Sequence, residues 1–131
     1  MKTITICGKE YPIDCKAITE LYFKQFFGID IMKRIKVIYD FLQKQTMISN
    51  QIIAENKEIS DKQLIKEVSL AMLEDLGEFK FAVTEIAYIC CYTANKKIGS
   101  YEEWLTGIDK PISSNDDWIV EVTELAVDCF C

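Results

Sequence analysis

Six cysteines, three pairs of adjacent acids and the lysines are the residues of this chain that could carry chemistry, because the sequence contains no histidine. The commonest general base near neutral pH is therefore missing, and Ser-His and Cys-His nucleophile pairs are excluded. The acid pairs are Glu74-Asp75, Glu102-Glu103 and Asp116-Asp117. Each is expected at a helix terminus, and acids are favourable beside a helix N-terminus. No lysine is singled out by its neighbours, so we expect no catalytic residue and no enzyme activity.

The cysteines do not have the spacing of a metal or redox centre. They are Cys7, Cys15, Cys90, Cys91, Cys129 and Cys131. Cys129 and Cys131 would need further ligands from elsewhere, and adjacent helical residues such as Cys90 and Cys91 point about 100° apart. The opening Met1-Lys2 leads into a strand-like run rather than a signal peptide, so reduced thiols are expected. We predict no metal and, without a P-loop or GxGxxG motif, no cofactor.

Negative charge is concentrated toward the C-terminus. Residues 1–100 carry 13 acids and 14 bases, whereas residues 101–131 carry 8 acids and one base, Lys110; their net charges of +1 and −7 sum to −6. Such an acidic segment is either a solvated face or a docking surface for a basic partner. No basic patch is evident, so direct nucleic-acid binding is not expected. No apolar run of about 20 residues is present, which predicts no membrane span.

The hydrophobic pattern predicts one mainly α-helical domain with five or six helices and a small N-terminal β-hairpin, which is α+β only at the margin. The expected parts are a hairpin at 3–13, a helical body at 16–107 and an acidic C-terminal helix at 115–129. The expected helices cover residues 16–27, 30–44, 61–76, 78–96, a short segment around Trp104, and 116–129. Residues 49–58 are expected to form a loop or a weak helix.

Turn and capping residues set these boundaries. Gly8-Lys9 marks the hairpin turn. The expected N-caps are Asp14, Asp30, Ser60 with Gln63, Ser100 with Glu103, and Ser114 or Asn115. The expected stops are Gly28, Gly77, Gly99 and Gly107.

Helical spacing also predicts which side chains face the core. In the first two helices they are Ile18, Leu21, Tyr22, Phe26, Ile31, Ile35, Ile38, Tyr39 and Leu42. In the third and last helices they are Leu64, Ile65, Val68, Met72, Leu73 or Leu76, Trp118, Ile119, Val122, Leu125 and Ala126. Lys33, Arg34 and Lys36 are expected to remain in solvent.

Residues 81–94 belong to a helix that is apolar on most sides, with Thr84, Glu85 and Thr93 as its clearly polar residues. A helix of this kind must be buried on several sides. It is therefore either the centre of the core or a core helix that also meets a partner.

Aromatic residues in and after this helix are the candidate partner-binding residues. Phe81, Tyr88 and Tyr92 recur at i, i+7 and i+11, so they share one side of the helix, and that side could meet a partner helix or be core. Tryptophan is enriched at interfaces but is also an ordinary core residue. The full candidate set is Phe81, Tyr88, Tyr92, Tyr101, Trp104 and Trp118.

Three segments resemble a known family. They are ITICGKEYPID, FFGIDI and FKFAVTEIAYICCYTANKKIGSYEEWLTGID, which cover about Thr3 to Ile31 and Phe79 to Asp109. Together they resemble the tail assembly chaperones of siphophages and prophages of Gram-positive bacteria. The segments are short hydrophobic signatures rather than a catalytic motif, and the resemblance is thin between residues 43 and 78.

The resemblance implies a non-enzymatic protein that binds the helical tape-measure protein, keeps it soluble and helps recruit tail-tube protein. Such chaperones act in the bacterial host cytoplasm and are not in the mature virion. Their genes often make a longer product by frameshifting, and this chain would then be the short form. Self-association is a further expectation from a helix that is apolar on two sides. The alternative is an acidic regulatory adaptor or a DNA-mimic inhibitor of a nucleic-acid enzyme, which the acidic segment motivates.

Overall fold

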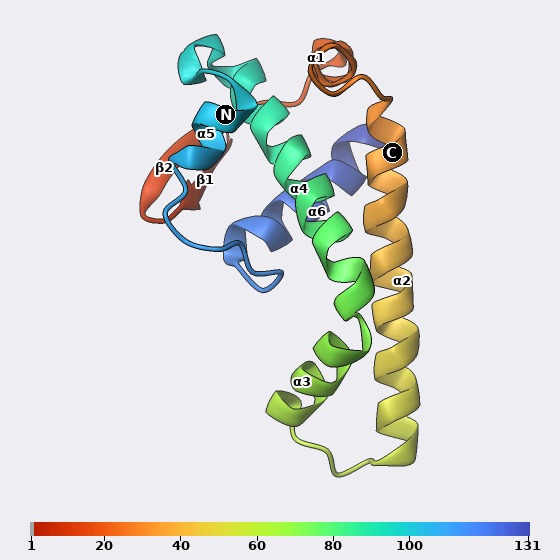
Figure 1. Cartoon of the computed structure of the whole chain (residues 1–131). Coiled ribbons are helices and arrows are strands. Elements are labelled where there is room, and N and C mark those ends of the chain that lie inside the picture. The colour runs from red at the N-terminus through yellow and green to blue at the C-terminus, as the bar shows by residue number, and fades with distance from the viewer. Residues whose placement is uncertain (1) are drawn as a thin grey trace.

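A computed structural model describes residues 2–131, and within that range it contains six α-helices and a two-stranded hairpin (Figure 1). The mainly helical fold with an N-terminal hairpin is thereby confirmed. The elements are β1 (Lys2–Ile6), β2 (Lys9–Ile13), α1 (Ala17–Phe27), α2 (Ile31–Glu55), α3 (Asp61–Ala71), α4 (Leu73–Ala94), the 3-10 turn η1 (Lys96–Ile98), α5 (Tyr101–Thr106) and α6 (Asp117–Phe130).

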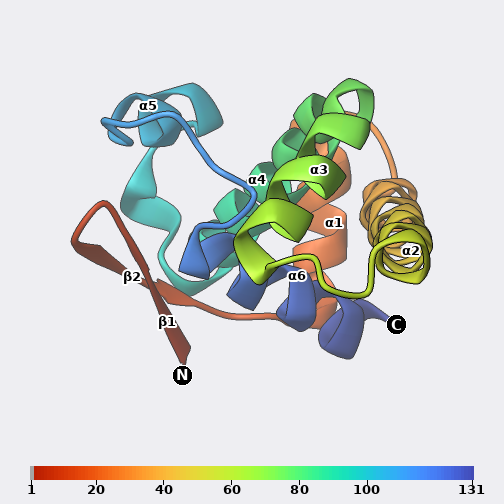
Figure 2. The same cartoon turned by 90° about the horizontal axis from the view of Figure 1, so that it is seen from below.

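Helix α4 is the centre of the fold. It packs against β2, α1, α2, α5 and α6, and the view in Figure 2 places it between the hairpin and α2. All six residues from Ile86 to Cys91 are buried, which confirms the predicted burial on several sides. The helix ends at Ala94 rather than near Lys96, because Asn95 accepts a hydrogen bond from the Lys97 amide and starts η1.

The hairpin presents one apolar face to the helices. Its turn is Cys7-Gly8, one residue before the predicted Gly8-Lys9, and Ile6 pairs with Lys9. Both turn residues have positive φ (52° and 78°), which is what a two-residue type I′ connection between twisted strands requires. The buried side chains are Ile4, Ile6, Tyr11 and Ile13, and they belong to the same core as α4 and α6.

The prediction for the inward face of α1 was wrong for three of its four residues; Tyr22 is half-buried against the core. Thr19 and Phe23 are buried, whereas Ile18, Leu21 and Phe26 are 40–50% exposed. The Thr19 hydroxyl lies 2.9 Å from the Thr93 hydroxyl of α4 and accepts a hydrogen bond from the Lys16 amide, so this polar residue orients the helix. Periodicity of apolar residues cannot detect such a contact.

The C-terminal end of α1 was predicted correctly, whereas its N-terminal cap was not. Gly28 stops the helix in the left-handed conformation (φ 74°), as expected. The predicted cap Asp14 is wrong: the N-cap residue is Lys16, and the Asp14 carboxylate instead pairs with the Lys16 ammonium at 3.2 Å.

Helix α2 begins as predicted, with the Asp30 carboxylate accepting the Met32 amide at 2.9 Å, but it continues to Glu55 rather than Lys44. The predicted loop or weak helix at 49–58 is therefore largely helical. Ile48 and Ile52 are half-buried, and packing against α3 stabilises this extension beyond what its own weak periodicity indicates.

One predicted core position in α2 was also wrong. Tyr39 is 53% exposed, whereas Phe41 is buried and stacks on Phe79 of α4 with ring centroids 4.0 Å apart.

The junction between α3 and α4 lies at Met72, not at the predicted Gly77. Ser60 caps α3 by accepting the Gln63 amide, as expected, and the helix then ends at Ala71. Met72 leaves helical geometry (φ −109°, ψ 12°) while its side chain is 1% exposed, so the chain turns where this residue enters the core. Gly77 lies inside α4.

The last two helices follow their predicted positions closely. Ser100 and Glu103 form the expected capping box of α5, with the Glu103 amide 3.1 Å from the Ser100 hydroxyl. Helix α6 starts after Asp116 instead of Ser114 or Asn115, and the Asp116 carboxylate accepts the Ser113 amide at 3.0 Å. Its buried residues are Trp118, Ile119, Val122, Thr123 and Ala126.

Candidate partner-binding surface

The six candidate aromatic residues differ in exposure. Tyr88 is fully buried, and Trp104 and Trp118 are 4% and 5% exposed. Tyr92 and Tyr101 are half-buried. Phe81 is 58% exposed, so it is the candidate whose side chain already meets solvent.

Four of these residues gather in one aromatic cluster. Tyr88 is its centre, with ring centroids 5.4 Å from Tyr101, 5.7 Å from Trp104 and 6.2 Å from Tyr92. Its hydroxyl donates to the Gly99 carbonyl at 2.7 Å, and burial raises the pKa of Tyr88 to about 12. This neutral, hydrogen-bonded phenol ties α4 to the start of α5 and supports the fold rather than offering a surface.

Two polar atoms in the same cluster have no hydrogen-bond partner within residues 2–131. They are the Tyr101 hydroxyl and Trp104 Nε1, and both are buried. Burial raises the pKa of Tyr101 to about 12. Since a buried polar group without a partner opposes folding, these two side chains stabilise the protein through their rings.

The exposed Phe81 borders an apolar pocket of about 280 Å³ between α4 and the loop after α5. Lys80 and Lys110 also line this pocket, beside Pro111 and Ile112. Trp118 lies on the other side of the same loop, in a separate hollow with Lys110 and Asp116. The structure therefore does not bring Phe81 or Trp118 into the aromatic cluster.

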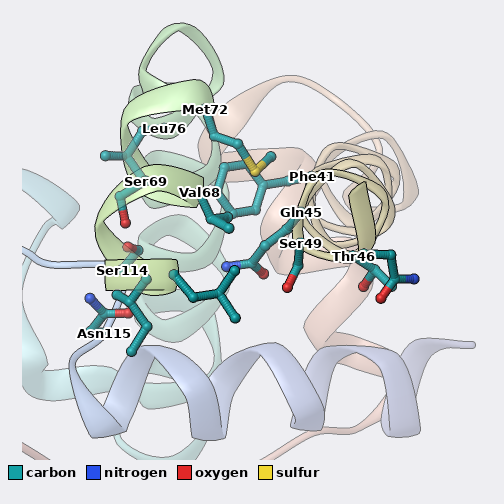
Figure 3. A pocket seen from close by; sticks show the side chains of 13 residues that line it. Phe41, Gln45, Thr46, Ser49, Val68, Ser69, Met72, Leu76, Ser114 and Asn115 are labelled. Atoms are coloured by element: carbon teal, nitrogen blue, oxygen red, sulfur yellow. The ribbon is translucent and has the colours of Figure 1, made fainter. Parts of the chain in front are cut away.

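A second pocket, of about 300 Å³, is a groove between α2 and α3 (Figure 3). Its apolar residues are Phe41, Leu64, Ile65, Val68, Met72 and Leu76. Its polar residues are Gln45, Thr46, Ser49, Asn50, Ser69, Ser114 and Asn115. None of the described residues that line this groove is ionisable, although 27% of the whole sequence is charged. An apolar floor with a neutral hydrogen-bonding rim suits an uncharged face of another protein.

Most of the groove lies on a helical hairpin that extends away from the rest of the molecule, formed by residues 45–71 and termed the arm below (Figure 1). The rest of its lining comes from outside the arm: Phe41, Met72, Leu76, Ser114 and Asn115. Val68 is the buried residue of α3. Large apolar side chains on and beside the arm are 41–63% exposed: Met47, Ile53, Ile65, Leu70 and Leu73. Ile65 is the one of these five that lines the groove, and an exposed apolar side chain in a hollow is suited to contact another protein.

Sequence reasoning missed the arm as a candidate site. Ile65 was predicted to face the core, yet it is 55% exposed; of the alternatives Leu73 and Leu76, Leu76 is half-buried and Leu73 is 59% exposed. A detectable signal was present, because the segment 45–71 contains more apolar residues than two antiparallel helices can cover with each other. Only the position of α3 decides which of them stay uncovered.

Acidic residues of the C-terminal segment lie mainly on the surface. The exposed ones are Glu102, Glu103, Asp109, Asp117, Glu124 and Asp128, and they are distributed over α5, the following loop and α6. They do not border the uncharged groove.

Residues 2–131 were also searched for a metal site and for a membrane-spanning helix. No cluster of three or more Cys, Asp or Glu side chains within residues 2–131 has a metal-binding arrangement. Within the same range, each helix is too short or too polar to cross a bilayer.

Comparisons of the chain with protein-family models, with curated proteins and with solved structures found no match.

Proposed function

We propose that this protein is a non-enzymatic tail assembly chaperone that binds an apolar helical segment of a tape-measure protein. The observation that carries the proposal is the groove between α2 and α3, whose described lining residues are all uncharged and include Ile65, which is 55% exposed. The resemblance of residues 3–31 and 79–109 to such chaperones supplies the partner's identity.

The physical argument starts from the partner. An amphipathic helix binds by placing its apolar face in a hydrophobic groove. A long helical protein that is not yet enclosed exposes many such faces and aggregates through them. The groove between α2 and α3 offers Ile65, Leu64 and Leu76 to the apolar face, and Gln45, Ser49 and Ser69 to polar groups at its edge.

The proposal places the protein in the bacterial host cytoplasm during assembly, absent from the mature virion. Recruitment of tail-tube protein belongs to the same proposal, since a chaperone that covers the tape-measure protein must be displaced as the tube forms. The groove is open to solvent, which is compatible with reversible binding.

Co-expression with a siphophage tape-measure protein is the direct test. We expect the two proteins to co-purify and the soluble fraction of the tape-measure protein to rise. Ile65→Glu, which adds a charge to the uncharged groove, is expected to weaken binding at least about tenfold, the effect of losing one interface anchor.

Two variants serve as comparisons. Leu21→Glu changes an equally exposed apolar residue on α1, outside both pockets, and is expected to leave binding unchanged. Phe81→Glu tests the pocket beside α4: if it abolishes binding while Ile65→Glu does not, the partner uses α4 and the groove assignment is wrong.

The proposal fails if the tape-measure protein neither co-purifies nor becomes more soluble. Salt-sensitive binding to a nucleic-acid enzyme, lost when acids of residues 101–131 are changed to amides, would instead favour the acidic adaptor or inhibitor.

A further inference from the structure

Two cysteines that are 75 positions apart in the sequence meet in the core. Cys15 lies in the linker between β2 and α1, Cys90 lies on α4, and their sulfur atoms are 3.4 Å apart. The linker is held there by the neighbouring backbone, because the Asp14 amide donates to the Cys90 carbonyl at 3.1 Å. Both thiols are free.

From this geometry we propose that Cys15 and Cys90 form an oxidation site that closes reversibly to an intrachain disulfide when the protein meets a peroxide. A disulfide bond is about 2.05 Å long, so the two sulfurs must approach by a little over 1 Å. Rotation of the half-buried Cys15 side chain can contribute much of that approach, since the fixed backbone contact already holds the linker on α4. The proposal is independent of the chaperone function.

The two thiols differ in reactivity. A hydrogen bond from the Cys90 thiol lowers the pKa of Cys15 to about 7, against the opposing effect of burial. Hydrogen bonding to Cys15 and burial raise the pKa of Cys90 well above its ordinary value. Since the thiolate is the nucleophile, Cys15 is the residue that attacks the oxidant and Cys90 is the resolving thiol.

The chemical steps balance with one peroxide molecule. The Cys15 thiolate attacks one peroxide oxygen, the O–O bond breaks, and Cys15 becomes a sulfenic acid while hydroxide leaves and takes up the Cys15 proton as water. The Cys90 sulfur then attacks the Cys15 sulfur, the S–O bond breaks, and the departing hydroxyl leaves as water with the Cys90 proton. Two thiols and one peroxide thus give one disulfide and two waters.

Two further cysteines could form a different disulfide in place of Cys15–Cys90. The thiol of Cys129, at the end of α6, also interacts with Cys15 and helps to lower the pKa of Cys15. Cys91 is buried next to Cys90, and burial raises its pKa to about 12. The Cys15 and Cys90 sulfurs lie 3.4 Å apart and the hydrogen bond to Cys90 affects the Cys15 thiol more than the one to Cys129, so the Cys15–Cys90 disulfide is the expected product.

Peptide mapping can identify the product directly. Cleavage after lysine yields the peptide 10–16 with Cys15 alone, the peptide 81–96 with Cys90 and Cys91, and a C-terminal peptide with Cys129 and Cys131. The full chain is treated with hydrogen peroxide, alkylated and digested without reductant. We expect a cross-linked species of 10–16 with 81–96 that disappears after dithiothreitol.

Matched variants show which of the two α4 cysteines, Cys90 or Cys91, is linked to Cys15. Cys91→Ala is expected to retain the cross-link, whereas Cys90→Ala and Cys15→Ala abolish it. The oxidised wild type should unfold about 5–10 °C above the reduced protein, because the disulfide restricts a long loop of the unfolded chain.

Three results would overturn the proposal. One is a cross-link of 10–16 to the C-terminal peptide in place of 81–96. Another is retention of the link to 81–96 in Cys90→Ala. The third is a wild-type protein whose Cys15 reaches sulfinic acid with no disulfide formed.

Discussion

Arg34 of α2 and Glu85 of α4 form a two-point ion pair inside the helix interface, with Nε 3.2 Å from Oε1 and Nη2 2.9 Å from Oε2. Both side chains are only 15% exposed. Arg34 was predicted to remain in solvent, so that prediction was wrong. The pair explains how an acid can lie in the central, largely buried helix: the Glu85 charge is matched by the one arginine of the sequence.

Removing one member of this pair should destabilise the protein. Arg34→Met leaves the Glu85 carboxylate partly buried without its partner, and we expect a loss of about 2–4 kcal/mol in the free energy of unfolding. The double variant Arg34→Met/Glu85→Leu replaces both charges and should recover most of the loss. Urea unfolding monitored by tryptophan fluorescence measures each value.

Lys36→Ala is the matched control on α2. It breaks an ion pair with Asp40 whose side chains are 73% and 57% exposed, and such pairs contribute little. A cost for Lys36→Ala equal to that for Arg34→Met would show that burial of the Arg34 pair has no special weight.

The ionisation of Glu85 should make stability depend on pH. Burial raises the pKa of Glu85 above 4.5, and this effect exceeds the lowering by Arg34. Between the unfolded and the folded pKa the folded protein binds more protons, so the contribution of Glu85 to stability falls as pH rises from about 4 through that interval. The free energy of unfolding of the wild type minus that of Glu85→Gln should decrease over this range. An increase with pH would contradict the assignment.

Two tyrosines of the aromatic cluster should respond oppositely to loss of their hydroxyls. Tyr88→Phe removes a hydrogen bond to the Gly99 carbonyl and should cost about 1 kcal/mol or more. Tyr101→Phe removes a buried hydroxyl that has no partner within residues 2–131, so it should be neutral or stabilising. Thermal unfolding of the two variants is a direct comparison, and equal losses would refute the difference.

Two glycines should also give opposite results when changed to alanine. Gly77 lies inside α4, and a Cβ added there meets no atom within 4 Å, so Gly77→Ala should stabilise by about 0.5–1 kcal/mol. Gly28 ends α1 with φ 74°, so Gly28→Ala should destabilise by about 1 kcal/mol. Chemical denaturation of both variants tests the pair, and destabilisation by Gly77→Ala would mean that its small size is needed in the pocket beside Phe81.

Local signals in the sequence were sufficient for the helical class, the hairpin and several helix ends. Asp30, Ser60 and Ser100 cap helices as predicted because a cap acts through backbone amides only two or three residues away. The burial of residues 86–91 also followed directly, since a helix that is apolar on most sides must be covered on several of them.

Tertiary structure alone decided the features that depend on residues distant in sequence. Thr93 selects which side of α1 is buried, and Glu85 draws Arg34 into an interface. With Met72 buried in the core, α3 ends at Ala71, six residues before the glycine that was expected to break it. The groove and the Cys15–Cys90 pair likewise form from residues that are distant in sequence and meet only in the folded chain. Periodicity reports how apolar a helix face is, but the neighbour that covers the face, or leaves it open, is set only when the whole chain packs.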